Sequence, residues 1–404
     1  MRVHDPYAAF RSSGFQAAFG CHIFTIFAAQ IQTTTIGWLL YERTGSAAVL
    51  GLVGLTVFVP VFLLALPVGF FVDFHSRKTL LMGGITMLAS SVLLMAFLAY
   101  IHAPVPFFFV ALTIIGIANT IVSISRPVLM RDVVQQHHAE NASNWSSFGR
   151  RVSSVLGPIL AGNTIAFSGA PSAFFIAALF YAIGLLCAQL IPSSPLQEGG
   201  PLTMQELFKG IHFMKRNPLV LSATLLDLCA ALLGGITGLM PIFARDILHV
   251  GPIGLGLLTA APSLGSGFMS FFLAHRPPLK RAGKTLLLAV GVYGFMTVLF
   301  GLSENVLLSI AALFVVGAAD AISVTVRGTI LQVFVPPHLR GRVYGVNTIF
   351  IYSSNELGDF ESGMLAALTS APVSVLTGGT AAMILAGIFA WKAKKLRSLG
   401  MMAV

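Results

Sequence analysis

Three acidic side chains lie within one short stretch of an otherwise apolar chain. The stretch "NELGDFESG", residues 355–363, contains Glu356, Asp359 and Glu361. Glu356 and Asp359 are three residues apart, so a helix would place them on one face, while Glu361 would point elsewhere. Two acids close together in a low-dielectric medium oppose each other's ionisation, so one of them can hold a proton near neutral pH. The spacing predicts a pair that carries protons or attracts a cation. Pairing with an arginine is the structural alternative.

Two further acids lie inside long apolar runs. Asp320 precedes Arg327 by seven residues, two turns along one helix face. Asp227 lies in a different run, at a depth similar to that of His22 in the first run. An ionisable group in hydrocarbon is costly and normally faces a cavity or a partner. Both acids therefore join the acids of residues 355–363 as candidates for proton coupling or substrate binding.

The chain that carries these acids has the composition of a membrane protein. Of its 404 residues, 56% are hydrophobic and 9% are charged, whereas a soluble protein has about 25% charged residues. A helix needs about 20 mostly apolar residues to cross a bilayer. Helices and closed barrels are the structures that satisfy backbone groups there, and long unbroken apolar runs exclude the alternating pattern of a barrel. The composition predicts an all-α protein that crosses the membrane many times.

Twelve apolar spans can be placed along the chain. In the first half they lie at residues 15–40, 48–72, 79–101, 105–130, 145–168 and 171–191. In the second half they lie at residues 218–245, 252–275, 285–302, 305–332, 343–368 and 372–391.

The basic residues predict the orientation of these spans. Of 24 Lys and Arg, only Arg43 and Arg245 fall in the odd-numbered connections, and 18 fall in the termini and even-numbered connections. Cytoplasmic loops carry this excess of Lys and Arg, so both termini are predicted to be cytoplasmic. The net charge of +10 follows from this bias, which argues against nucleic acid as a partner.

The two halves of the chain resemble each other. A shift of 201 positions places Gly116, Asn119 and Arg126 over Gly317, Asp320 and Arg327. Two six-span halves of one ancestry are indicated, the arrangement of transporters with a central site. We expect an N-terminal half at 1–191, a cytoplasmic linker with an amphipathic helix at 192–217, and a C-terminal half at 218–404. Because Arg126 and Arg327 are repeat partners, a structural role is favoured for both.

One polar corner carries a family resemblance. In "GFFVDFHSRK", Gly69, Asp73, Arg77 and Lys78 match the loop between the second and third spans of the major facilitator superfamily, while Phe74 and Ser76 depart from it. Four other stretches resemble the branch of that superfamily that contains enterobactin exporters and related transmembrane secretion effectors: "WLLYERTGSAAVLGLVGL", "RPVLMRDVV", "LMPIFARDIL" and "PPHLRGRVYGV".

The resemblance implies a fold and a gating device. The family has two six-helix halves, with spans 1, 4, 7 and 10 around a central cavity. In the family the corner at 69–78 forms part of a cytoplasmic latch, to which Asp132 at the end of span four would contribute. Gln30, Thr34 and Trp38 recur every four residues on span one. With Asn119 they suit a cavity wall, although helix packing explains them equally.

We therefore expect a monomeric transporter of a bacterial inner membrane that exports a small molecule by alternating access. Proton antiport is the expected energy source, because no nucleotide-binding motif is present and the spans carry carboxylates. The substrate would be siderophore-, drug- or metabolite-like. No enzymatic activity, cofactor or metal is predicted. A lysolipid or lipid flippase, and a receptor of the same fold that does not transport, are the alternatives.

Overall fold

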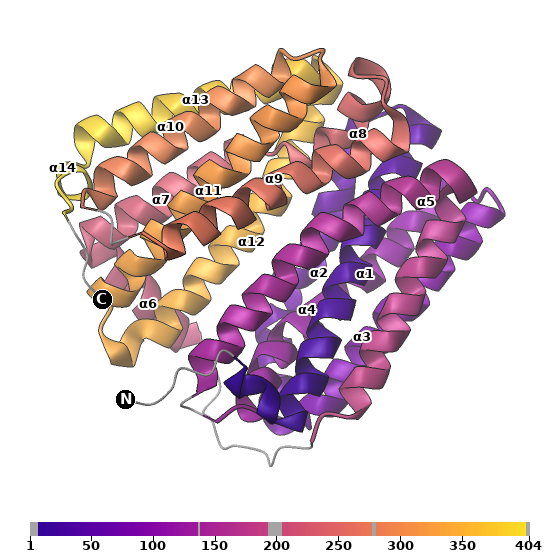
Figure 1. Cartoon of the computed structure of the whole chain (residues 1–404), viewed down its shortest axis with the longest axis horizontal. Helices are drawn as coiled ribbons and strands as arrows, with labels where there is room; N and C mark the ends of the chain where they lie inside the picture. The colour runs from indigo at the N-terminus through magenta and orange to yellow at the C-terminus, as the bar shows by residue number, and fades with distance from the viewer. Residues whose placement is uncertain (1–6, 136–137, 193–203, 277–279, 401–404) are drawn as a thin grey trace. The chain divides into compact units, whose positions relative to one another are not determined.

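The computed structural model describes residues 7–135, 138–192, 204–276 and 280–400. In these ranges every regular element is a helix, as Figure 1 shows, so the predicted all-α fold is confirmed. Ten of the described helices are long and apolar enough to cross a membrane.

The first half contains five long helices. After the short η1 (Ala8–Arg11) they are α1 (Ser13–Thr44), α2 (Ala47–Phe74), α3 (Arg77–Tyr100), α4 (Val105–Asp132) and α5 (Ala139–Gln189). The 51-residue α5 joins the two spans predicted at 145–168 and 171–191. They meet at Gly169, whose φ of 80° lies in the left-handed region that favours glycine.

The second half starts with α6 (Met204–Arg216), which lies within the predicted linker; residues 193–203 of that linker lie outside the described part. The segments that follow are α7 (Pro218–Leu233), η3 (Thr237–Leu239), α8 (Met240–Ile242), the π-helix η4 (Phe243–Ile247), α9 (Gly251–Ala274), α10 (Ala282–Gly301), α11 (Val306–Phe334), α12 (Pro337–Leu368), α13 (Ala371–Lys392) and the short α14 (Lys394–Arg397).

These helices correspond to the twelve predicted spans. The ten candidate spans count α5 once and treat residues 218–247 as one span. The eleventh predicted span is α12, whose 32 residues include the three acids of "NELGDFESG" and which is not among the candidate spans found in the described residues.

Side-chain caps fix several helix starts. Asn305 precedes α11, and its Oδ1 accepts hydrogen bonds from the N–H groups of Leu307 and Leu308 at 2.9 and 3.1 Å. Asn217 caps α7 in the same way. Such caps satisfy N–H groups that have no partner inside a helix.

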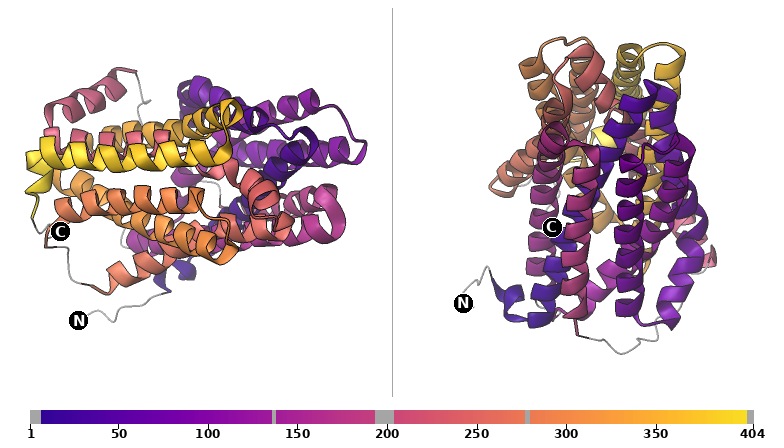
Figure 2. Two further views of the ribbon diagram at one scale, coloured as in Figure 1. Left: turned by 90° about the horizontal axis from the view of Figure 1, so that it is seen from above. Right: turned by 90° about the vertical axis from the view of Figure 1, so that its right-hand side faces the viewer.

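The contacts divide the chain into two compact units. Unit 1 comprises Met1–Leu39 and Thr56–Leu202, and unit 2 comprises Leu40–Leu55 and Thr203–Val404. In unit 1, α3 packs against α4 and α5. In unit 2, α11 packs against α9 and α10, and α13 lies alongside α10, yellow beside orange in Figures 1 and 2. The division into halves at 191 and 218 stays a prediction.

Candidate functional site

The seventh predicted span is broken in its middle. The helix α7 ends at Leu233, residues 234–236 are not helical, and the chain continues through η3, α8 and the π-helix η4. A helix end leaves carbonyl groups without helical partners, and a helix start leaves N–H groups without them. Two side chains from other helices contact this break. The Tyr293 hydroxyl of α10 donates to the Gly234 carbonyl at 3.3 Å, and Asp359 Oδ1 of α12 accepts from the Gly238 N–H at 3.1 Å.

Glycines let the neighbouring backbones approach the break closely. A Cβ atom on Gly358 of α12 would lie 2.6 Å from the Ala231 carbonyl oxygen of α7. A Cβ atom on Gly54 of α2 would lie 3.2 Å from the Glu356 carbonyl oxygen and 3.3 Å from Glu356 Oε2. The side chains of Glu356 and Asp359 therefore lie beside the first turns of α2, and Asp359 also contacts the break in α7; these segments belong to unit 2.

Tyr293 lies within electrostatic reach of Asp359 and of Asp320. The charges of Asp320 on α11 and of Asp359 on α12 both act on the Tyr293 hydroxyl. Asp320 is exposed, whereas the Tyr293 hydroxyl binds the Gly234 carbonyl at the break in α7. Carboxyl and phenol groups within reach of each other can hold or pass a proton. Tyr293 was missed by the sequence reasoning, although one hydroxyl-bearing aromatic residue inside the apolar ninth span was a usable signal.

The remaining acidic candidates have other partners. Asp227 of α7 forms an ion pair with Arg327 of α11, whose side chain is 6% exposed. Burial of an arginine normally requires such a partner. Glu361 Oε2 accepts from the hydroxyl of its neighbour Ser362 at 3.4 Å. The partners of Asp227 and Glu361 are thus Arg327 and Ser362, and neither partner belongs to the break in α7.

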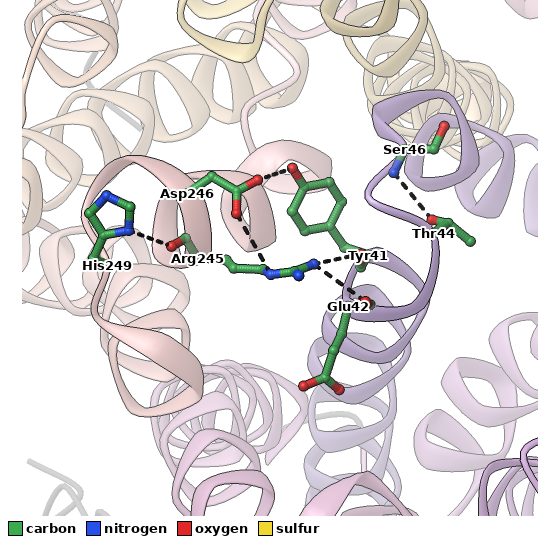
Figure 3. A network of polar contacts seen from close by, with 7 residues as sticks. All are labelled: Tyr41, Glu42, Thr44, Ser46, Arg245, Asp246 and His249. Carbon is green, nitrogen blue, oxygen red and sulfur yellow. Dashed lines mark hydrogen bonds and ion pairs between the residues drawn. The ribbon is translucent and has the colours of Figure 1, made fainter.

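A polar network lies where η4 meets the end of α1 (Figure 3). The Tyr41 hydroxyl donates to Asp246 Oδ2. The Arg245 guanidinium donates to the carbonyls of Tyr41 and Glu42 at 3.1 and 3.4 Å and lies 5.6 Å from the Tyr41 ring centre. Arg245 also pairs with Asp246 at 3.6 Å, and His249 Nδ1 lies 3.0 Å from the Arg245 carbonyl oxygen.

This network caps the carboxyl end of α1. A cation that binds the last carbonyls of a helix also interacts favourably with the helix dipole. The π-helical turn of η4 carries both Arg245 and Asp246, and such turns are frequent at functional sites. The sequence reasoning did not identify this network. Its signal was Arg245, one of two basic residues in the odd-numbered connections.

The corner that resembled a family motif lies in unit 1. Arg77 Nη1 pairs with Asp132 Oδ2 at 2.7 Å, with both side chains buried. Lys78 Nζ donates to the carbonyls of Gln189 and Ile191 at 2.7 Å each, which caps α5. Asp73 lies in the last turn of α2, and its side chain lies outside the described part of the structure.

Gln30 of the predicted cavity wall packs against α5 in unit 1. Gln30 Nε2 donates to the Ser154 hydroxyl of α5 at 3.4 Å. A Cβ atom on Gly157 would lie 2.6 Å from Gln30 Cβ. Thr34 and Trp38 are each 6% exposed, and Asn119 is half-buried. This packing agrees with the alternative explanation, and a role in a cavity stays a prediction.

Comparison with protein families gives a match that covers most of the chain. Residues 18–358 match the model of the Major Facilitator Superfamily. Among curated proteins, the enterobactin exporter EntS of Citrobacter koseri is 29% identical over 57% of this chain and 55% of its own length. The exporter of the same name from Escherichia coli O9:H4 is 28% identical over 58% and 56%. The aligned region thus spans about half the length of these relatives.

Solved structures share the fold at low sequence identity. A bacterial homologue of the human lysosomal transporter Spinster has a TM-score of 0.74 and 14% identity, covering 98% of this chain and 99% of its own. The nucleoside transporter NupG has a TM-score of 0.71 and 16% identity, covering 94% and 99%. The family match over residues 18–358, supported by these folds, shows that the chain belongs to the major facilitator superfamily of secondary transporters and is not an enzyme.

Proposed function

We propose that the chain exports a small molecule by alternating access and that proton antiport drives the export. The observation that carries this proposal is the contact of Asp359 with the broken span, where its carboxylate accepts the Gly238 N–H at 3.1 Å. An antiporter needs an acid that is stabilised as an anion in one conformation and protonated in another.

The broken span supplies the two conditions for such a switch. While the N–H of Gly238 binds Asp359, the ionised carboxylate has a donor inside the protein. When the break rearranges and that donor moves away, an enclosed carboxylate is costly and takes up a proton. Tyr293 and the exposed Asp320 offer a route for that proton, because both lie within electrostatic reach of the same site.

The cytoplasmic latch is the second part of the proposal. We assign to it Gly69, Asp73, Arg77, Lys78 and Asp132. The buried Arg77–Asp132 pair and the Lys78 cap on α5 join the cytoplasmic ends of α3, α4 and α5. Breaking of such contacts would accompany opening of the cytoplasmic side, which we propose also holds both termini.

The relatives support the proposed direction of transport and the proposed compartment. The curated relatives are described as enterobactin exporters, which favours export across a bacterial inner membrane and makes enterobactin one substrate to test. The alignment covers only 55% of that relative, so we do not propose enterobactin alone. The proposed substrate class is a siderophore, drug or metabolite.

A proteoliposome assay tests the proposal. Purified protein would be reconstituted with an internal pH dye and given an outward or inward proton gradient, with enterobactin, a hydrophobic drug and a lysophospholipid as candidate substrates. Proton movement that depends on substrate and is lost in Asp359→Asn is expected. Transport of the lysophospholipid would indicate a flippase. Binding without proton or substrate movement in all arms would indicate a receptor and contradict the proposal.

A further inference from the structure

Residues 40–55 form a helical hairpin that joins α1 to α2 and belongs to unit 2. Only Gly45 and Ser46 separate the two helices, and the φ of Gly45, 60°, lies in the left-handed region. The Gly45 N–H donates to the Tyr41 carbonyl at 2.8 Å. The Ser46 N–H donates to the Thr44 hydroxyl at 3.2 Å, as Figure 3 shows. These bonds fix the turn, so we expect the end of α1 and the start of α2 to move as one piece.

The α2 arm of the hairpin lies directly on α12. A Cβ atom on Gly51 would lie 2.9 Å from the Phe360 carbonyl oxygen, and one on Gly363 would lie 2.6 Å from the Gly51 Cα atom. A Cβ atom on Gly54 would lie 3.3 Å from Glu356 Oε2. At these points the backbones approach closely, as small residues allow in membrane proteins. The hairpin therefore lies against the Glu356 carboxylate and must move aside before that side of the carboxylate opens.

The α1 arm of the hairpin is held by polar side chains of η4. The Tyr41 hydroxyl donates to Asp246 Oδ2, and the Arg245 guanidinium donates to the carbonyls of Tyr41 and Glu42 (Figure 3). Tyr41 is 5% exposed, whereas the side chains of Arg245 and Asp246 are 40% and 49% exposed. Water can replace the contacts of these two charged groups, so separating them costs far less than breaking a buried ion pair. Such contacts can hold the hairpin and still release it.

We propose that Tyr41, Arg245 and Asp246 form a lock on the hairpin, and that the locked hairpin closes the path from outside to Glu356. The turn of the hairpin and Arg245 both lie in odd-numbered connections, which the bias of Lys and Arg predicts to be outside the cytoplasm. The lock deepens the proposed function and rests on it: the acids of α12 exchange protons with the outside only after the lock has opened.

Thiol labelling measures this access directly. In a protein without its native cysteines, Glu356→Cys places a thiol beside the hairpin, and a charged methanethiosulfonate reagent is added to right-side-out vesicles. Tyr41→Phe removes the hydroxyl that binds Asp246 and keeps the ring. We expect it to raise the labelling rate about tenfold, the effect of losing a hydrogen bond to a charged group. Arg245→Gln should also raise the rate, and it decides should Tyr41→Phe fail to fold.

Tyr181→Phe is the matched control. The Tyr181 hydroxyl donates to Gln32 Oε1 at 3.0 Å within unit 1, so this variant loses the same chemical group without touching the lock. It should leave the labelling rate unchanged. An unchanged rate in Tyr41→Phe, or an equal rise in Tyr181→Phe, would overturn the lock.

The side of entry separates a lock from a general loosening of the protein. In inside-out vesicles, where the reagent reaches the cytoplasmic side, Tyr41→Phe should not raise the labelling rate. An equal rise from both sides would overturn the lock. Labelling requires no transport, so a rise from outside in a protein that moves neither protons nor substrate would contradict the export proposal and leave the lock intact. Proton antiport together with unchanged labelling would contradict the lock alone.

Discussion

Tyr293 and Asp359 act on opposite ends of the same break. The phenol donates to a carbonyl at the end of α7, and the carboxylate accepts from an N–H at the start of η3. Each group matches the partial charge of the helix end that it contacts. A protonated Asp359 carboxyl would accept a weaker hydrogen bond from that N–H. The protonation of Asp359 and the conformation of the break are therefore coupled.

That coupling gives a prediction for three acids. Asp359→Asn and Asp320→Asn should abolish uphill, pH-driven export and leave downhill exchange measurable, because an amide cannot carry a proton. Glu356→Gln should give the same pattern to a smaller degree. Glu361→Gln is the control, since Glu361 contacts Ser362 instead of the break. Counterflow and pH-driven uptake in the same vesicles check this. Full pH-driven export in all three variants would exclude these residues as proton carriers.

At the scale of helices, glycine decides how closely α12 approaches α7. A Cβ atom on Gly358 would meet two backbone carbonyl oxygens of α7, at 2.6 and 3.0 Å. Backbone atoms cannot rotate away as a side chain can, so the helices would have to separate.

We therefore expect Gly358→Ala to lower the free energy of unfolding by about 1–3 kcal/mol, the usual cost of overpacking. Gly291→Ala on α10 is its control, because a Cβ atom there has no described atom within 4 Å. That change should be neutral or stabilise by up to about 1 kcal/mol through helix propensity. Thermal unfolding in detergent measures both. Equal stability of the two variants would show that the α7–α12 contact is not tight.

A buried ion pair joins the start of α3 to the end of α4. Asp132→Asn would leave the Arg77 charge, 9% exposed, without its carboxylate, at a cost of about 3–5 kcal/mol. Lys78→Gln removes a cap on α5 and should cost about 1 kcal/mol or less. Urea or thermal unfolding of both variants measures the loss in the free energy of unfolding, which should be larger for Asp132→Asn than for Lys78→Gln. A smaller effect at Asp132 than at Lys78 would refute a supporting role for the pair.

For the whole molecule, topology can be tested at two exposed corners. In a protein without its native Cys21, Cys187 and Cys229, a cysteine at His75 should react with an impermeant maleimide only from the cytoplasm. A cysteine at Glu304 should react only from outside. The reason is the bias of Lys and Arg towards the even-numbered connections. Labelling from the opposite sides would reverse the proposed orientation.

Hydropathy and charge predicted the helical spans and drew attention to the acids, because both signals are local. Glu356 and Asp359 stood out as charges in an apolar run. Their contact with the break in α7 could not be predicted, since it depends on how α12 packs against a different span. Likewise the repeat identified Arg126 and Arg327 as equivalent positions of the two halves. It could not predict the groups that they bind, because Thr25 and Asp227 lie about 100 residues away from them in sequence.

The broken seventh span also covers more residues than the matching part of the first span. Gly45 and Gly251, with φ values of 60° and 64°, end the first span of each repeat. From Thr25 to Gly45 there are 20 residues, and from Asp227 to Gly251 there are 24. The surplus of four is about one helical turn, and the break and the π-helical turn both lie in the longer stretch. Gly238, whose N–H binds Asp359, lies in that longer stretch as well.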